Sequence, residues 1–176
     1  FASIEKELKI TMNPIVSHPD KAVSPEDLPK IIHSIYAVHN GVFRMSPDID
    51  GLVEASSSLA RVMVGNGSFM TQSLQRSSVE STKDDVANTI RASFEANGCE
   101  VIQNGDYPGW QPNKDSEILT ILHDLYVSKY NEEPKVKACH AGLECGILLQ
   151  HLPKVDMISF GPNIRAPHSP DEKVQI

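Results

Sequence analysis

The sequence has few cysteines, no basic run and no long apolar stretch. Only three of its 176 residues are cysteine, and their odd number and spacing fit no disulfide framework, which favours a reducing, cytoplasmic setting. The formal net charge of -7 without a Lys/Arg cluster argues against nucleic acid and anionic membranes as partners. The apolar runs are too short to span a bilayer. No secretory signal is visible, and because the chain starts at Phe1 rather than Met, we expect its natural start to lie upstream.

Up to residue 105 the sequence alternates between strand and helix patterns. Strands are expected at residues 7–15, 52–64, 68–78 and 99–103. Asn66-Gly67 is a strong hairpin signal, because a tight two-residue turn needs positive φ at both positions. The two middle strands should therefore pair directly with each other.

Two helices are predicted in the same region. Ser24-Pro25-Glu26-Asp27 marks the start of the first, with a hydroxyl, a proline and acids in the first turn, and Asn40-Gly41 marks its end. Its apolar face consists of Leu28, Ile31, Ile32, Ile35 and Val38. The second helix begins at Ser81 or Thr82, ends at Asn97-Gly98 and turns one apolar face inward. That face consists of Val86, Ile90 and Phe94.

The resulting order is β-α-β-β-α-β, the pattern of a ferredoxin-like unit with both helices on one face of an antiparallel sheet. We assign residues 1–105 to this α+β unit. Asp106 to Pro112 is a turn-rich connector. Residues 106–176 contain a helix that Asp115 caps, strands at 135–139 and 155–160, and a helix at 143–151 between these strands. This is an α/β pattern with a parallel sheet too small to be complete, so we expect it to be a fragment of a larger domain.

The stretch from Cys139 to Glu172 concentrates the reactive side chains. Its most informative residue is His168, because Pro167 and Pro170 stiffen the loop and fix where the imidazole points. A loop histidine beside acids can also be a plain surface residue. The functional interpretation makes His168 a metal ligand, with a nearby acid such as Glu172 holding its second nitrogen.

One histidine cannot hold a metal alone, because zinc takes three or four protein ligands. A closed zinc site of Cys139, His140, Cys145 and His168 has suitable ligand types, but the spacing matches no paired Cys-x-x-Cys knuckle. Cys139 and Cys145 fit better as small packed apolar residues. If His168 is a ligand, most of its site lies elsewhere.

Three further residues have both a functional and a plain interpretation. Glu144 is either a first-turn acid that the helix dipole favours or a group that supports a substrate site. Arg76 shares a strand face with Met70, Gln72 and Leu74, where arginines are usually solvated. Asn40 is most simply the C-cap of the first helix.

The motifs taken together resemble the aminoacyl-histidine dipeptidases, also called Xaa-His or cytosol non-specific dipeptidases. These are di-zinc metallopeptidases related to carboxypeptidase G and aminoacylase. The similarity covers nearly the whole chain, in order. Its segments are Asn40-Gly41-Val42-Phe43-Arg44, Arg76-Ser77-Ser78, Tyr107-Pro108-Gly109-Trp110-Gln111-Pro112, Cys139-His140-Ala141-Gly142-Leu143-Glu144-Cys145-Gly146, Asp156-Met157-Ile158-Ser159-Phe160-Gly161-Pro162 and Pro167-His168-Ser169-Pro170-Asp171-Glu172-Lys173-Val174.

This resemblance implies that the chain is the C-terminal portion of such an enzyme, half of a ferredoxin-like lid followed by part of the α/β catalytic domain. It implies that His168 is the last ligand of two zinc ions, with manganese or cobalt as alternatives. Arg76 would grip the carboxylate of a dipeptide substrate, Asn40 would contact substrate, and Glu144 would support the site. The general-base glutamate and the other ligands belong to the missing N-terminal region, and the lid histidine that polarises the scissile carbonyl in relatives is also absent from this chain.

The implied reaction is hydrolysis of dipeptides by a metal-activated water, and the isolated chain should be inactive. The lid also offers a face for a homodimer, since exposed sheet edges invite pairing. Two alternatives stay open at this point. One is a non-catalytic ferredoxin-like module for ligand binding or dimerisation, because this fold hosts many functions. The other is a small structural zinc protein, which chelators would unfold.

Overall fold

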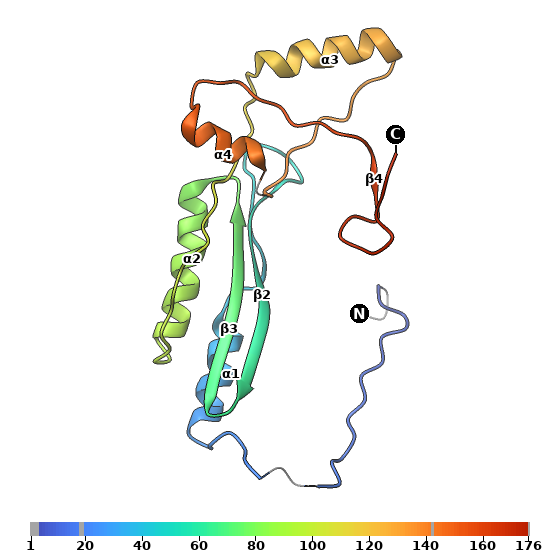
Figure 1. The fold of residues 1–176 in the computed structure, drawn as a ribbon. Coiled ribbons are helices and arrows are strands. Elements are labelled where there is room, and N and C mark those ends of the chain that lie inside the picture. Colours follow the sequence, from blue (N-terminus) through green and yellow to red (C-terminus); the bar gives the residue numbers. More distant parts are fainter. Residues whose placement is uncertain (1–3, 18–19, 142, 176) are drawn as a thin grey trace.

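The structure, a computed structural model, describes residues 4–17, 20–141 and 143–175 (Figure 1). Gly142 of the motif before the last helix, and the terminal residues Phe1 and Ile176, lie outside the described residues. The elements in the described part follow in chain order. They are α1 (Asp27–Ala37), β1 (Gly41–Met45), β2 (Val53–Gly65), β3 (Ser68–Ser77), α2 (Glu80–Glu95), α3 (Glu117–Tyr130), α4 (Glu144–His151), β4 (Ile164–Arg165) and β5 (Lys173–Val174).

The largest sheet is antiparallel, with the strand order β1-β2-β3. The predicted hairpin forms between β2 and β3, and Asn66 and Gly67 have φ values of 51° and 77° at its turn. Both angles lie in the left-handed region, where asparagine and glycine meet the least steric resistance. The prediction of a mixed α/β chain with a small antiparallel sheet is therefore confirmed.

Side-chain alternation divides the sheet into a covered face and an open face. Along β3 the residues from Phe69 to Ser77 in steps of two are buried or half-buried. Those between them, including Leu74 and Arg76, are exposed. Because successive side chains of a strand point to opposite faces, the pattern means that helices cover one face only. Arg76 thus shares the open face with Met70, Gln72 and Leu74, as predicted.

The core lies between α2 and the covered face. Val86, Ile90 and Phe94 are 1%, 6% and 5% exposed and pack against Ala55 of β2 and Val38 at the end of α1. Their spacing of four residues places them on one side of α2, so its predicted inner face is confirmed. In α1 the apolar face is covered less completely, because Leu28 and Ile32 are 45% and 52% exposed.

The start of α1 agrees with the predicted segment 24–27, whereas α2 and α3 differ from the predictions by one or two residues. α1 begins at Asp27, where the Ser24 hydroxyl oxygen accepts the Asp27 N–H at 3.0 Å. α2 begins at Glu80 rather than Ser81 or Thr82. α3 is capped by Ser116, whose side chain accepts the Leu119 N–H, and not by Asp115. Serine and aspartate are both good N-caps, so their order in the sequence does not decide between them.

Four predicted strands are wrong within the described residues. Residues 7–15, 99–103, 135–139 and 155–160 belong to no strand. A strand exists only where its N–H and C=O groups pair with a neighbour. The described part of the chain offers none to these four segments, so neither the two outer strands of the ferredoxin-like pattern nor the parallel pair forms.

Two short features were missed. β1 pairs with β2 directly after Asn40, and a second sheet forms where β4 pairs with β5 in an antiparallel hairpin. Strands of 5 and 2 residues are too short to show a clear alternation in sequence. Within the described residues, no helix combines the length and the apolar character that crossing a membrane requires.

Candidate functional site

The open face of the sheet carries a polar cluster near the C-terminal end of β3. Arg76 on β3 stands directly opposite Ser56 on β2. Cross-strand partners point to the same face, so the guanidinium and the hydroxyl lie side by side. Within the described part of the chain, Arg76 forms no ion pair or hydrogen bond through its side chain. Its guanidinium therefore keeps all five N–H donors available.

His140 joins this cluster from far along the sequence. Its Nε2 atom lies 2.8 Å from the Ser56 hydroxyl oxygen, across a separation of 84 residues. The ring is half-buried, and its pKa is lowered first by this burial and second by the positive charge of Arg76. The imidazole of His140 is therefore neutral near pH 7, and it can donate or accept a hydrogen bond without repelling the guanidinium.

Two close backbone approaches hold the His140 loop over the sheet. A Cβ at Gly109 would collide with the Ser77 carbonyl oxygen and lie 2.9 Å from the Ser78 carbonyl carbon. A Cβ at Gly146, in the first turn of α4, would lie 3.0 Å from the carbonyl oxygens of Pro108 and Gly109. At Gly109 any side chain would force the backbone to shift, and at Gly146 it would be tightly crowded. The connector is thus sandwiched between β3 and α4, which sets the segment before α4 beside Arg76.

Lys83 of α2 fastens the same connector to the first turn of the helix. Its ammonium donates to the Tyr107 carbonyl at 2.6 Å and forms ion pairs of 2.8 Å with both Glu80 and Asp106. Burial lowers the pKa of Lys83, but the hydrogen bonds and charges of Asp106 and Glu80 outweigh it, so the net shift is upward. Glu80 also accepts the Gly109 N–H at 2.5 Å. The connector is therefore fixed at three of its residues, Asp106, Tyr107 and Gly109.

Asn40 precedes β1, and Glu144 starts α4. The Asn40 side-chain oxygen accepts the Leu59 N–H at 2.8 Å, which ties the start of β1 to β2. Asn40 is not the C-cap of α1, because that position is Val38. Glu144 is the first residue of α4 and is exposed. Neither side chain has a described hydrogen bond to Arg76 or His140.

His168 occupies the loop between β4 and β5 and is exposed. Figure 1 shows this hairpin apart from the three-stranded sheet. His168 has a φ of 62°, a left-handed conformation that is uncommon for residues other than glycine. Glu172 accepts the main-chain N–H of His168 at 3.2 Å, so its carboxylate fixes the loop, and no contact with the imidazole ring is present among the described residues.

The described residues do not form a metal site by themselves. Nowhere in residues 4–17, 20–141 and 143–175 do three His, Cys, Asp or Glu side chains gather closely enough to hold an ion. His140 bonds to Ser56, while His168 lies on the β4–β5 hairpin, so the closed set with Cys139 and Cys145 is not assembled. Because zinc takes three or four protein ligands, the groups present do not fit a complete zinc centre.

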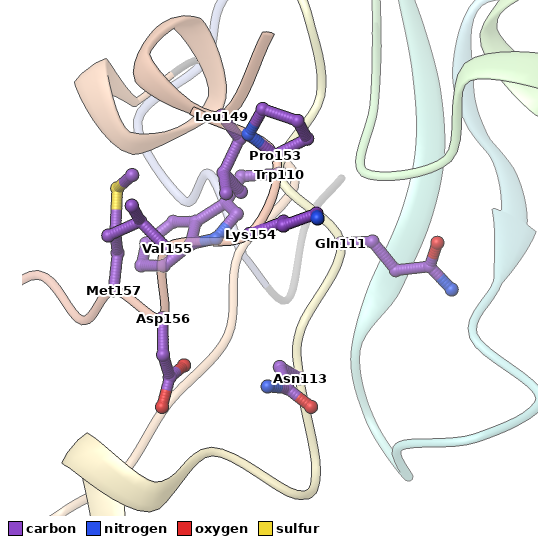
Figure 2. A pocket seen from close by; sticks show the side chains of 9 residues that line it. All are labelled: Trp110, Gln111, Asn113, Leu149, Pro153, Lys154, Val155, Asp156 and Met157. Atoms are coloured by element: carbon purple, nitrogen blue, oxygen red, sulfur yellow. The ribbon is translucent and has the colours of Figure 1, made fainter. Parts of the chain in front are cut away.

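A hollow of about 280 Å³ lies between the connector and the segment after α4. Figure 2 shows Trp110, Leu149, Val155 and Met157 on its apolar wall, with Asp156 extending toward the first turn of α3. Asp156 accepts hydrogen bonds from the Ile118 N–H at 3.0 Å and the Ser116 hydroxyl at 2.8 Å. These bonds lower its pKa. The carboxylate is thus occupied in capping α3, and the hollow is a packing feature.

Sequence reasoning missed Ser56 and Lys83 entirely and considered His140 only as a zinc ligand. Ser56 lies in a run of three serines on β2, where nothing in the local pattern distinguishes it. The most useful sequence feature was the pair of glycines, Gly109 and Gly146. Each lies in a short motif, and a glycine there is consistent with another backbone segment passing close by. A glycine can indicate that a segment packs closely at its position, but it does not identify the segment that packs there.

Comparison with known proteins shows what this arrangement resembles. The chain is 34% identical over 176 residues to a cytosol non-specific dipeptidase from Escherichia coli (strain K12), covering 100% of this chain and 36% of that protein. The resemblance to the dipeptidases is confirmed. A crystal structure of aminoacylhistidine dipeptidase from Vibrio alginolyticus superposes with a TM-score of 0.86 and 36% identity, over 98% of this chain and 35% of that one. No protein-family model matches the chain.

The chain thus spans about a third of the length of the dipeptidases it matches. The match runs through both the sheet with Arg76 and the segment with His168. The fold described above therefore matches one part of these two dipeptidases, and the matched region contains both Arg76 and His168.

Proposed function

We propose that this chain is the C-terminal portion of a zinc-dependent dipeptidase that hydrolyses Xaa-His and other dipeptides. The observation that carries the proposal is the end-to-end similarity to two dipeptidases, in sequence at 34% identity and in structure at a TM-score of 0.86. A module that only binds ligands, or a small structural zinc protein, would not account for a match of this extent. Cytoplasmic localisation is part of the proposal.

Arg76 is the residue that would bind the substrate's C-terminal carboxylate. Its support is geometric, because the guanidinium is exposed on the open face and no acid within the described residues neutralises it. A planar guanidinium forms two parallel hydrogen bonds to a carboxylate and rejects a neutral end group. Recognition of that end would restrict the enzyme to substrates whose chain stops one residue after the scissile bond.

His168 is the residue that would contribute to the metal centre. Its left-handed backbone conformation is held by Glu172, and conformations of this kind are often retained at functional positions despite their cost. The other ligands and the general base would come from the N-terminal region of the same protein. A bound metal supplies a water acidic enough to attack a peptide carbonyl. The described residues do not gather three ligands for a metal, so no chemical step is assigned to this chain alone.

The remaining assignments follow from the same proposal. Asn40 would contact substrate through the amide hydrogens that its bond to Leu59 leaves free, and Glu144 would support the site from the start of α4. Residues 1–105 would form part of the lid and residues 106–176 part of the catalytic domain. The open sheet face exposes Val42, Met70 and Leu74 and would be available to a second copy in a homodimer.

The proposal is tested by assaying Xaa-His hydrolysis with zinc present in three samples. These are the full-length protein, the full-length protein with His168→Ala, and this 176-residue chain alone. Activity is expected only in the first sample, together with a lower zinc content in the second. Hydrolysis by the chain alone, or full activity and zinc content after His168→Ala, would overturn the assignment.

A further inference from the structure

The Ser56–His140 pair has no part in the roles assigned so far, yet it stands beside Arg76. The pair joins β2 to the segment before α4 at 2.8 Å, and Ser56 is the cross-strand partner of Arg76. We propose that Ser56, Arg76 and His140 form one carboxylate-binding site, in which the serine–histidine pair supplies a hydrogen bond that the guanidinium leaves unmade. This inference rests on the proposed function, because it deepens the role of Arg76.

A carboxylate needs a hydrogen-bond donor in addition to the guanidinium, because the guanidinium does not fill all of its lone pairs. A carboxylate has two oxygens with about four acceptor positions, and a guanidinium in its two-pronged geometry fills two of them. A carboxylate that leaves water loses the hydrogen bonds to its other positions unless the protein replaces them, and an unreplaced bond to a charged group weakens binding. A neutral donor next to Arg76 meets that need without adding repulsion.

The serine–histidine pair provides such a donor whichever tautomer His140 adopts. A neutral imidazole carries one ring N–H and a serine one O–H, so the pair has two protons, and the 2.8 Å bond between them uses one. If the hydroxyl donates to Nε2, the ring proton stays on Nδ1 and is free. If Nε2–H donates, the hydroxyl proton is free instead. One donor is therefore always left over.

The electrostatic setting supports the same role. Arg76 is the charged group that acts on His140, and it lowers the imidazole pKa together with burial. A bound carboxylate would offset the charge of Arg76 and remove this repulsion. The site thus holds a neutral ring next to a cation that no acid of the described residues neutralises, an arrangement suited to receiving one negative charge.

The fold fixes the cluster rather than leaving it to flexible side chains. Ser56 and Arg76 are held in register by the β2–β3 ladder. His140 is positioned by the glycine contacts that press the connector between β3 and α4. Groups held by backbone contacts lose little conformational entropy when a ligand binds, which favours affinity.

The test compares a dipeptide with the same dipeptide carrying a C-terminal carboxamide, using the full-length enzyme. Ser56→Ala and His140→Ala should each raise KM for the free acid about tenfold, the factor for losing one hydrogen bond to a charged group, and change kcat less than about twofold. KM for the carboxamide should not change. His140→Gln, whose amide nitrogen can replace Nε2 toward Ser56, should recover part of the loss.

Two controls separate binding from structure. Ser58→Ala removes an exposed hydroxyl two residues along the same face of β2, and His33→Gln replaces an exposed histidine of α1. Both should leave KM for either substrate unchanged. A KM that rises equally for the acid and the carboxamide in Ser56→Ala and His140→Ala would mean a structural role and overturn the inference. An unchanged KM for the acid would do the same.

A binding measurement without turnover covers the case of an inactive enzyme. Calorimetry of the dipeptide and its carboxamide on the metal-free full-length protein should show about tenfold weaker binding of the acid alone in both variants. Equal binding by variant and unmodified protein would overturn the inference. The two proposals fail differently. Absence of hydrolysis by the unmodified, zinc-loaded enzyme refutes dipeptidase function. If Arg76→Ala weakens binding of the acid but Ser56→Ala and His140→Ala do not, only the three-residue site is refuted.

Discussion

At the scale of single residues, the structure separates groups that stabilise the fold from groups that remain available to a ligand. Lys83 and Arg76 are both cations near the connector, yet their surroundings differ. The Lys83 side chain is 9% exposed and bonded on all sides, whereas Arg76 is exposed with no acid beside it among the described residues. The residue with unmet hydrogen-bonding capacity is the better candidate for function.

Lys83 should therefore matter for stability. Lys83→Met removes the donor to the Tyr107 carbonyl and should lower the free energy of unfolding by about 1–3 kcal/mol, since Glu80 and Asp106 are largely exposed and screened. Lys30→Met, which breaks an exposed pair with Asp27 on α1, should change the free energy of unfolding far less, because water and salt screen exposed charges. Urea denaturation compares them. Equal losses of unfolding free energy in the two variants would contradict the role of Lys83 in holding the connector.

Asp156 predicts a pH dependence. The Ile118 N–H and the Ser116 hydroxyl hold the pKa of its carboxyl below the ordinary 3.8. A lowered pKa stabilises the fold above pH 3.8, and this contribution is lost as the pH falls through the lowered value. Asp156→Asn should remove this part of the acid dependence, so the unfolding free energies of variant and parent should converge as the pH falls below 3.8. Parallel curves down to the lowest pH would contradict it.

At the scale of elements, the packing of β3, the connector and α4 is the feature that creates the cluster. Residue spacing predicted the helices and the β2–β3 hairpin because those elements are local: Val86, Ile90 and Phe94 repeat every four residues, and Asn66-Gly67 defines its own turn. The Ser56–His140 contact could not be predicted in this way. It depends on where the connector runs, and no local pattern encodes that path.

The failed strands have a related cause. Residues 135–139 and 155–160 have strand-like composition, but a strand is a property of a pair of segments. The sequence correctly placed Arg76 on the open face of the sheet and His168 in a loop, and their roles in the site stay predictions. It did not indicate that Arg76 has a serine and a histidine beside it.

Gly109→Ala tests the packed connector. The added Cβ would meet the Ser77 carbonyl and lie 2.9 Å from the Ser78 carbonyl carbon, so the chain must shift, at a cost of about 1–3 kcal/mol. Gly161→Ala is the matched control, because nothing lies within 4 Å of the added Cβ. Thermal unfolding should show a clear loss for the first and almost none for the second. Equal unfolding temperatures would mean that the connector does not pack closely on β3.

At the scale of the whole molecule, the polar groups are divided between two regions that the described chain does not bring together. The carboxylate-binding cluster lies on the sheet, and His168 lies on the separate β4–β5 hairpin (Figure 1). A dipeptidase needs both a grip on the substrate's end and a hydrolytic centre. The chain spans about a third of its relatives' length, and the proposal places the rest of that centre in the remainder of the enzyme.

The most direct test of this account is the ratio of kcat/KM for an Xaa-His dipeptide to that for its C-terminal carboxamide, in the full-length enzyme and in its Arg76→Ala variant. The unmodified enzyme should prefer the free acid strongly. Arg76→Ala should reduce that preference by about tenfold or more, because the charged hydrogen bonds that recognise the carboxylate are gone. An Arg76→Ala enzyme that keeps the full preference would contradict the central claim that this chain carries the carboxylate grip of a dipeptidase.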